Sequence, residues 1–260
     1  MSEPVRLTIE AGLAHIVLAR PEANNAMSAA FIDAFARAAE AVAADPAVRA
    51  VLVTAEGKNF SVGGDLNSFV GAADPGDFIA GLAGRLHDGI KALARCEAPL
   101  VVAVHGAAAG AGLSLAAAGD IVVAGEGATF TMAYTAIGLT SDGGATWTLP
   151  RLIGLRRAQE MAYLNRRVTA AEALDWGLVT RVVADAEVAA TGLAMARQIA
   201  AGPTRAFGRV KQLFAEAYAT PLGDQLDTEA REIGAALRTQ DAQGAVRAFI
   251  AREKPVFTGE

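Results

Sequence analysis

The sequence predicts an α/β fold in which repeated β–β–α units are followed by a region of helices alone. Two glycine-rich turns, at residues 60–65 and 105–112, each follow an apolar run of strand-like composition, at residues 50–54 and 100–104. Strand-like and helical patterns alternate around these turns, and from about Glu187 the hydrophobic period is purely helical. Strands that alternate with helices are typical of α/β proteins.

The first predicted elements are a hairpin and a long helix. Residues 5–10 and 14–18 alternate apolar and polar side chains around Ala11-Gly12, which is a hairpin pattern. Ser28 is a candidate N-cap for a helix that runs to about Ala44, where Asp45-Pro46 ends it. The apolar run at residues 50–54 then follows as a strand.

The rest of the core is expected to continue this alternation. Residues 71–76 are expected to form a loop, a helical stripe covers residues 79–93, and the second apolar run begins after Pro99. Next we expect a helix over residues 111–118, followed by strands over residues 121–124 and 129–132. Helices over residues 149–164 and 169–176 and a strand over residues 179–183 complete the core. Thr169 and Glu172 have the spacing of a capping box at the start of the last of these helices.

The C-terminal part is predicted to be a separate helical region. Gly202-Pro203 and Thr220-Pro221 interrupt its helical pattern, and the first break separates an α/β core, assigned to residues 1–198, from helices over residues 199–260. Large apolar residues give these helices more apolar surface than an isolated appendage would leave in water, namely Leu213, Phe214, Tyr218, Leu222 and Leu226. We therefore expect this region to join copies of the chain.

Composition and charge exclude several classes of function. The chain is 53% hydrophobic and 20% charged, which fits a folded globular protein, and its net charge of −5 without a basic cluster gives no footprint for nucleic acid. The single Cys96 excludes an internal disulfide framework, fits a reducing cytoplasm and has no neighbours that would complete a metal site. Residues 1–4 show no secretory pattern, so a cytoplasmic protein is expected.

One uncharged segment has the length of a membrane span. Residues 98–119 contain no Asp, Glu, Lys or Arg over 22 positions. The segment is mostly Ala and Gly, contains His105 and changes its hydrophobic period halfway. It is therefore expected to be a buried strand that leads into a buried helix, and no membrane association is expected.

The two glycine turns also point to a chemistry. Glycine lets a ligand approach the backbone closely, and two peptide N–H groups aimed at one point can hold an oxyanion that develops on a carbonyl oxygen. Either turn alone is explained as well by ordinary turn formation or close helix packing. Taken together with the motifs that accompany them, the two turns favour carbonyl chemistry.

Several motifs occur together in one order. They are residues 20–27, the two glycine turns, Asp120, and the segments at residues 149–154 and 171–179. In this order the chain resembles the crotonase superfamily, also called the enoyl-CoA hydratase/isomerase family. The resemblance implies a crotonase-like spiral of ββα units with a C-terminal helical trimerisation region, acting on acyl-CoA thioesters as a homotrimer or homohexamer. It implies no cofactor apart from the coenzyme A that the substrate carries.

The resemblance also assigns roles to individual residues. The backbone N–H groups of Gly64 and Ala111 would form the oxyanion hole. The residues that would contact the substrate and its coenzyme A are Asn24, Ala26, Met27, Val62, Gly63, Asp65, Leu66, Gly110 and Tyr134, with Phe249 and Arg252 contributed across a subunit boundary. Asp65 also suits a purely structural role in its turn.

Departures from the family pattern bear on the reaction. The positions of the two glutamates used by family hydratases are taken here by Ser114 and Tyr134, and neither is a carboxylate. By its position, Asp142 instead resembles the aspartate of dienoyl-CoA isomerases. The chain is also similar to epoxyphenylacetyl-CoA isomerases in the residues around this aspartate and at the C-terminus, namely residues 132–133, 146–147 and 257–259. A carboxylate beside an oxyanion hole can remove a proton from one carbon and return it to another, which is an isomerisation.

The surroundings of Asp142 leave two interpretations of this residue. Ile137, Leu139 and Trp147 are expected to form an apolar lining around an acid–base carboxylate. The structural alternative is that Asp142 is a turn residue before Gly143-Gly144. The lining of the acyl pocket is expected within residues 67–84.

Other functions stay open at this point. Overall resemblance also fits an enoyl-CoA hydratase, because a fold does not fix a reaction. The spacing of His87 from Pro99 is similar to that of the base in aryl-CoA dehalogenases. A dehalogenase or thioester hydrolase would then use Asp142 as a nucleophile with His87, although His87 also suits a half-exposed helical position. A protein that binds coenzyme A without catalysis is the remaining alternative.

Overall fold

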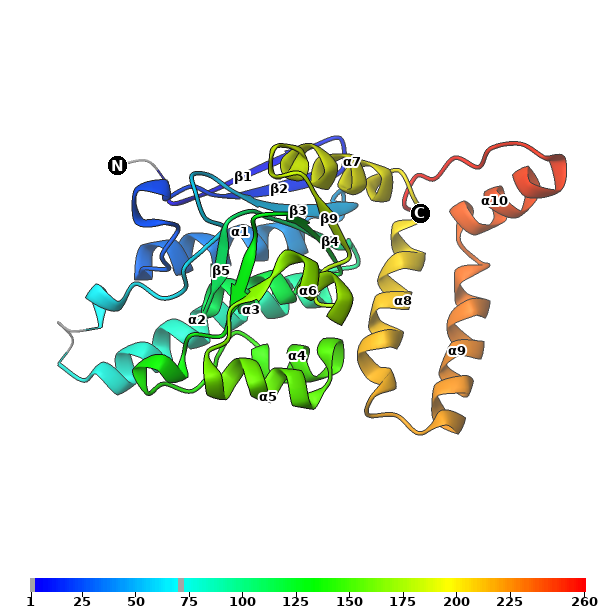
Figure 1. Ribbon diagram of the computed structural model, residues 1–260. Coiled ribbons are helices and arrows are strands. Elements are labelled where there is room, and N and C mark those ends of the chain that lie inside the picture. The colour runs from blue at the N-terminus through cyan, green and yellow to red at the C-terminus, as the bar shows by residue number, and fades with distance from the viewer. Residues whose placement is uncertain (1–2, 70–72) are drawn as a thin grey trace.

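The protein is built on a six-stranded sheet whose strands are mostly parallel. A computed structural model describes residues 3–69 and 73–260 (Figure 1). The strands lie across the sheet in the order β1 (Val5–Glu10), β2 (Leu13–Leu18), β3 (Ala50–Ala55), β4 (Leu100–Val104), β6 (Ile121–Gly125) and β9 (Arg181–Val183). The β1–β2 pair is antiparallel and the other pairs are parallel. The predicted hairpin and strands of the core are confirmed.

A second, smaller sheet passes through the second glycine turn. It contains β5 (Ala107–Ala109), β7 (Thr129–Thr131) and β8 (Val168–Thr169), with β7 in the middle. Residues 105–112 were expected to form only a turn, so β5 is a strand that was not predicted. Its three alanines carry no alternating pattern that would reveal a strand.

Helices cover the large sheet on both faces. On one face, Val51 and Val53 belong to a core cluster with Phe31 and Phe35 of α1 (Ala29–Ala44), and α1 in turn packs against α2 (Pro75–Arg95). On the other face, Leu52 belongs to a second cluster with residues of α7 (Val188–Ala200). Because neighbouring strand residues point to opposite faces, β3 contributes to both layers.

Side-chain caps mark the start of two of the predicted helices. Ser28 caps α1 as predicted, because its side chain accepts a hydrogen bond from the Phe31 N–H. The capping box between Thr169 and Glu172 is also present at the start of α6 (Ala170–Trp176). The uncharged segment forms β4, β5 and α3 (Ala111–Ala117), which confirms a buried strand that leads into a buried helix.

The prediction of a single helix over residues 149–164 is wrong. The structure has two helices there, α4 (Ala145–Ile153) and α5 (Leu155–Leu164), separated by Gly154. Gly154 has φ of +79° and ψ of +153°, a non-helical conformation that glycine adopts readily and that interrupts the helix. The loop expected over residues 71–76 lies in part outside the described residues, and α2 already begins at Pro75.

The C-terminal region contains three helices. They are α8 (Thr204–Ala217), α9 (Leu222–Ala236) and α10 (Gln240–Ala251), and in Figure 1 they stand to one side of the core. The two predicted breaks separate α7 from α8 and α8 from α9, whereas the break before α10, where Thr239 is the N-cap, was not predicted. Because α7 continues to Ala200, the predicted boundary at residue 198 falls just inside that helix.

The C-terminal tail connects the last helix to the core. Arg49 donates hydrogen bonds to the carbonyl oxygens of Gly202 at 2.7 Å and Phe257 at 3.1 Å. Asp241 accepts from the backbone N–H groups of Thr258 at 2.7 Å and Gly259 at 2.8 Å. Desolvation opposes ionisation of Asp241, but these hydrogen bonds and the Arg49 charge hold its pKa below the usual value.

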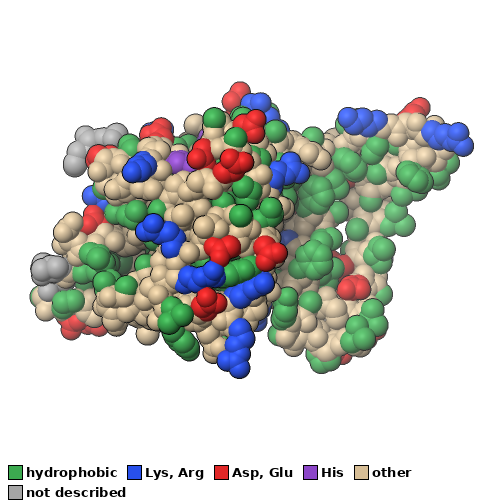
Figure 2. All heavy atoms as spheres, viewed as in Figure 1, with side chains coloured by type: hydrophobic (Ala, Val, Ile, Leu, Met, Phe, Trp, Pro, Cys, Tyr) green, Lys and Arg blue, Asp and Glu red, His purple; other side chains and the backbone are tan. Residues whose placement is uncertain are grey.

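The surface of the C-terminal helices is notably apolar. Figure 2 shows hydrophobic side chains gathered over this part of the molecule. The exposed fractions are 71% for Phe214, 74% for Leu222, 84% for Phe249 and 77% for Ile250. Over residues 3–69 and 73–260, no helix has the length and apolar character needed to cross a membrane.

Candidate active site

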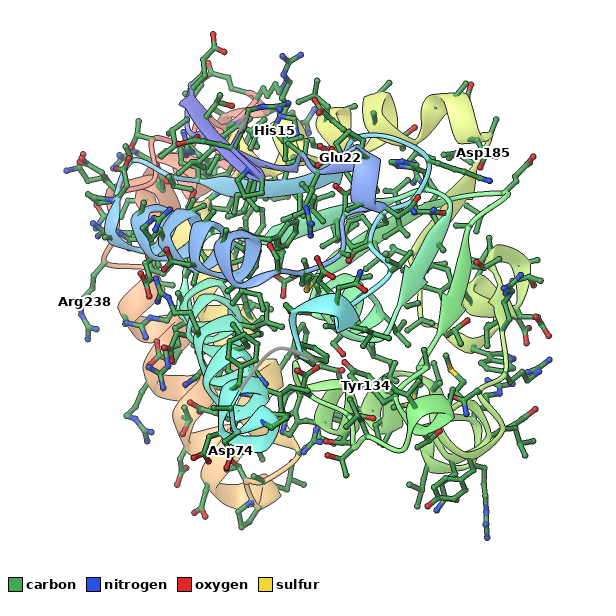
Figure 3. The ribbon with its side chains drawn as sticks, turned by 90° about the vertical axis from the view of Figure 1, so that its left-hand side faces the viewer. His15, Glu22, Asp74, Tyr134, Asp185 and Arg238 are labelled. Atoms are coloured by element: carbon green, nitrogen blue, oxygen red, sulfur yellow. The ribbon has the colours of Figure 1, made fainter. Side chains whose placement is uncertain are left out.

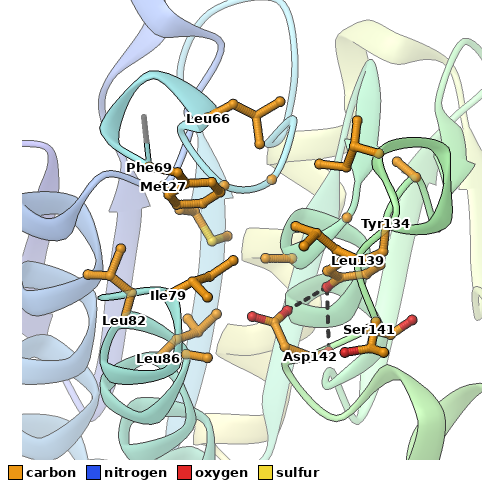
Figure 4. A pocket seen from close by; sticks show the side chains of 18 of the residues that line it. Met27, Leu66, Phe69, Ile79, Leu82, Leu86, Tyr134, Leu139, Ser141 and Asp142 are labelled. Atoms are coloured by element: carbon orange, nitrogen blue, oxygen red, sulfur yellow. Dashed lines mark hydrogen bonds between the residues drawn. The ribbon is translucent and has the colours of Figure 1, made fainter. Parts of the chain in front are cut away.

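A cavity of about 550 Å³ lies between helix α2 and the segment that follows strand β7. Figure 4 shows its two sides, with Ile79, Leu82 and Leu86 facing Tyr134 and Asp142. The two glycine turns supply further lining residues, namely Val62, Gly63, Gly64, Leu66, Gly110 and Ala111. The cavity therefore brings together residues that the sequence analysis placed in one site although they are far apart in the chain.

The two glycine turns are held together by backbone hydrogen bonds. The Ser61 N–H donates to Ala107 O at 3.1 Å, and the Ala109 N–H donates to Ser61 O at 2.9 Å. Gly63 has φ of +92°, and a Cβ atom there would lie 2.8 Å from Ala109 O and 3.3 Å from Ala111 N. Glycine at this position is therefore required by backbone conformation and by close approach.

Two backbone N–H groups at the cavity are available to a ligand. Gly64 and Ala111 both line it, and their N–H groups donate no hydrogen bond to any residue in the described part of the chain. Ala111 is the first residue of α3, so its N–H is one of the unpaired donors at the positive end of a helix. The arrangement is compatible with the predicted oxyanion hole, which stays a prediction.

Asn25 connects the loops around these N–H groups, and its role was missed. Its side chain is fully buried and donates to the carbonyl oxygens of Glu56 and Asn59, both at 2.9 Å, while accepting from the Arg20 N–H at 2.8 Å. Ser61 Oγ donates to Asn25 O at 2.8 Å. A possible signal was the tandem Asn24-Asn25, since both residues have the positive φ that asparagine tolerates well.

Asp142 is the one carboxylate among the described residues that line the cavity. Tyr134, also in the lining, donates its hydroxyl to Asp142 Oδ1 at 2.6 Å. Burial and the negative charge of Asp142 raise the pKa of Tyr134 above its usual value, so this phenol stays protonated and remains a donor. Within residues 3–69 and 73–260, no group of three His, Cys, Asp or Glu side chains is arranged to hold a metal.

Ser114 lies behind Asp142 rather than in the cavity. Its side chain is fully buried. Its Oγ lies 2.8 Å from the Tyr134 hydroxyl and donates a hydrogen bond to Asp142 O at 3.0 Å. Both residues that replace the family glutamates thus contact Asp142. Only Tyr134 reaches the cavity.

His87 contacts the backbone beside Asp142. Its Nε2 accepts a hydrogen bond from the Gly143 N–H at 2.9 Å, so this nitrogen carries no proton. His87 is not among the described residues that line the cavity. The hydrogen bond fixes the peptide that follows Asp142.

The predicted coenzyme A contacts fall into two groups. Met27 lines the cavity together with the glycine-turn residues named above. Asn24, Ala26 and Asp65 contact neighbouring loops: Asn24 O accepts from the Val62 N–H at 3.3 Å, while Arg20 Nη1 donates to Ala26 O at 2.9 Å and to Asp65 Oδ2 at 2.8 Å. Their predicted contacts with coenzyme A stay predictions. The carboxylate of Asp65 therefore has the structural role that its turn suggested.

Phe249 and Arg252 lie on and directly after α10, outside the lining of the cavity. Their predicted contribution across a subunit boundary stays a prediction.

The apolar lining agrees with the sequence in part. Ile137 and Leu139 line the cavity, as do Phe69, Ile79 and Leu82 from the expected range of residues 67–84; residues 70–72 in that range lie outside the described residues. The placement of Trp147 in the lining is wrong. Trp147 is 49% exposed on α4, where the Arg151 guanidinium lies 4.1 Å from the centre of its ring.

The position of Tyr134 is visible from a second direction. In Figure 3 Tyr134 lies between α2 and the green helices, whereas Asp185 and Arg238 lie toward opposite edges of the view. The cavity thus combines two free N–H groups, an apolar wall and one carboxylate held by a neutral phenol. Such a site can bind a carbonyl group and move a proton beside it.

Comparisons with known proteins agree with this geometry. The family model described as enoyl-CoA hydratase/isomerase matches residues 8–260. A probable enoyl-CoA hydratase of Rhodobacter capsulatus is 38% identical, with 98% of each chain covered, and the 1,2-epoxyphenylacetyl-CoA isomerase of Escherichia coli is 36% identical, with 100% of each covered. A crystal structure assigned as an enoyl-CoA hydratase/isomerase of Mycobacterium abscessus superposes with a TM-score of 0.94 at 40% identity, covering 98% of this chain and 100% of that one. The chain has the crotonase fold and belongs to the enoyl-CoA hydratase/isomerase family, whose members act on acyl-CoA thioesters.

Proposed function

We propose that the protein is an acyl-CoA isomerase that shifts a double bond, or rearranges a ring, in an enoyl-CoA-type thioester. The observation that carries the proposal is the position of Asp142, whose carboxylate lines the same cavity as the unpaired N–H groups of Gly64 and Ala111. A base and an oxyanion hole in one apolar cavity are what enolate chemistry requires.

The chemical steps need only these groups. Asp142 takes a proton from the carbon next to the thioester, and the electrons of that C–H bond move into the carbonyl to form a dienolate. The N–H groups of Gly64 and Ala111 hold the negative oxygen. The protonated Asp142 then returns the proton to the far end of the conjugated system, which completes the shift without any other reactant.

The contacts of Ser114 and Tyr134 favour isomerisation over hydration. Hydration by two carboxylates needs one group to position and activate water and another to deliver a proton. Ser114 is buried out of the cavity, and Tyr134 is a protonated phenol that donates to Asp142. Asp142 is then left as a single proton carrier. The dehalogenase alternative is disfavoured because His87 Nε2 is already bonded to the Gly143 N–H.

The unmodified protein provides the first test. In deuterated water we expect it to convert a β,γ-unsaturated or dienoyl-CoA thioester to its isomer faster than it hydrates crotonyl-CoA. Nuclear magnetic resonance follows the shift and any deuterium incorporation, and absorbance of the enoyl thioester follows hydration. Rapid hydration of crotonyl-CoA with no isomerisation would refute the proposal and favour a hydratase.

The proposed assembly is a homotrimer or a dimer of trimers that works in the cytoplasm. The apolar side chains exposed on α8, α9 and α10 support it, because contact between copies would remove them from water. Light scattering at micromolar concentration is expected to give three or six times the chain mass of 26.6 kDa. A monomer under these conditions would contradict the assembly and the shared contacts predicted for Phe249 and Arg252.

A further inference from the structure

We propose that Tyr134 is the positioning residue of Asp142. Its hydroxyl donates a hydrogen bond to Oδ1, which leaves Oδ2 as the oxygen that takes and returns the substrate proton. This inference rests on the proposed function and specifies which oxygen of Asp142 transfers the proton. It also changes the role predicted for Tyr134, from a contact with substrate to a contact with the base.

The hydrogen bonds around the carboxylate support this assignment. A tyrosine hydroxyl has one proton, and the shortest contact of the Tyr134 hydroxyl is the 2.6 Å bond to Asp142 Oδ1. Within the described part of the chain, Oδ2 accepts no side-chain or backbone hydrogen bond. In Figure 4 the carboxylate extends toward the apolar side of the cavity that carries Ile79 and Leu86.

The hydroxyl of Tyr134 is itself held in place. Ser114 Oγ lies 2.8 Å from it, and Ser114 is fixed by the carbonyl oxygens of Asp142 at 3.0 Å and Gly110 at 3.3 Å. Burial and the nearby carboxylate keep the phenol protonated. The donor therefore remains directed at Oδ1 before and after the proton transfer.

One consequence follows for the reaction. A fixed Oδ1 prevents rotation of the carboxyl group of Asp142. The proton on Oδ2 then stays beside the dienolate until it is returned, instead of turning away and exchanging with water.

The test is Tyr134→Phe, which removes only the hydroxyl. In deuterated water we expect a smaller share of the product protons to come from the substrate, because the protonated carboxyl group can then turn away and exchange with water. A change in folding alone would not alter this transferred share.

Matched variants separate this role from others. Tyr163→Phe removes the same atom from a tyrosine on α5 that is 70% exposed, and we expect it to behave as the unmodified protein. Ser114→Ala keeps the bond between Tyr134 and Asp142 but removes the contact that orients it, so a smaller change in the same direction is expected. If Tyr134→Phe does not fold, unchanged values in Ser114→Ala overturn the proposal.

The failure of this inference can be told apart from the failure of the proposed function. An unchanged transferred share in a folded Tyr134→Phe protein overturns the assignment of Tyr134. Isomerisation that survives Asp142→Asn overturns the proposed function itself.

Discussion

Replacing Asp142 with Asn is expected to abolish isomerisation while leaving thioester binding nearly intact. Asparagine has nearly the same size, and its side-chain oxygen can still accept the hydrogen bond from Tyr134, but it cannot take a proton from the substrate. A positioned acid–base group contributes roughly 10²–10⁴-fold in rate, so a loss of this order is expected. The rate of isomerisation of a β,γ-unsaturated thioester and calorimetric titration with acetyl-CoA are the two measurements.

The matched controls for this prediction are His87→Ala and an assay of hydration. His87 bonds only to the backbone beside Asp142, so its removal is expected to slow isomerisation without abolishing it. If His87→Ala lost activity as completely as Asp142→Asn, the result would favour the alternative in which Asp142 is a nucleophile and His87 is its base. Rapid hydration of crotonyl-CoA that persists in Asp142→Asn would mean that another carboxylate performs the chemistry.

The main features of the fold were predictable because they depend on local patterns. The β1–β2 hairpin, the Ser28 cap and the alternating strands and helices each follow from turn chemistry and hydrophobic period over a few residues. Gly154 shows the limit of this approach. The apolar period continues across it, and its positive φ divides the predicted helix into α4 and α5 without changing that period.

The site was predictable as a set of residues but not as a set of contacts. Resemblance brought Gly64, Ala111 and Asp142 together, and the cavity contains all three. The bond between Tyr134 and Asp142 and the three bonds of the Asn25 side chain depend on how loops approach one another. No local pattern encodes such partners, which is why the contact between Tyr134 and Asp142 was not predicted and Asn25 was missed.

Replacing Ala111 with Pro is expected to remove one donor of the oxyanion hole while preserving the fold. Ala111 is the first residue of α3, the helical position where proline is best tolerated because its missing N–H had no partner within the helix. The preceding Gly110 has φ of +52° and ψ of −127°, a mirror-image extended conformation that glycine alone adopts readily and that suits the residue before a proline.

The expected effect of Ala111→Pro is a fall in kcat of about 10²–10³-fold, the typical cost of losing one oxyanion donor. Ala111→Gly is the matched control, because it changes the side chain but keeps the N–H, and it is expected to retain most of the activity. Circular dichroism and thermal unfolding check that both variants fold. Since Gly64 keeps its own N–H, some stabilisation of the dienolate remains, and activity should be reduced rather than absent. Full activity in a folded Ala111→Pro protein would show that the oxygen of the thioester is held elsewhere, because a proline at this position has no hydrogen to donate.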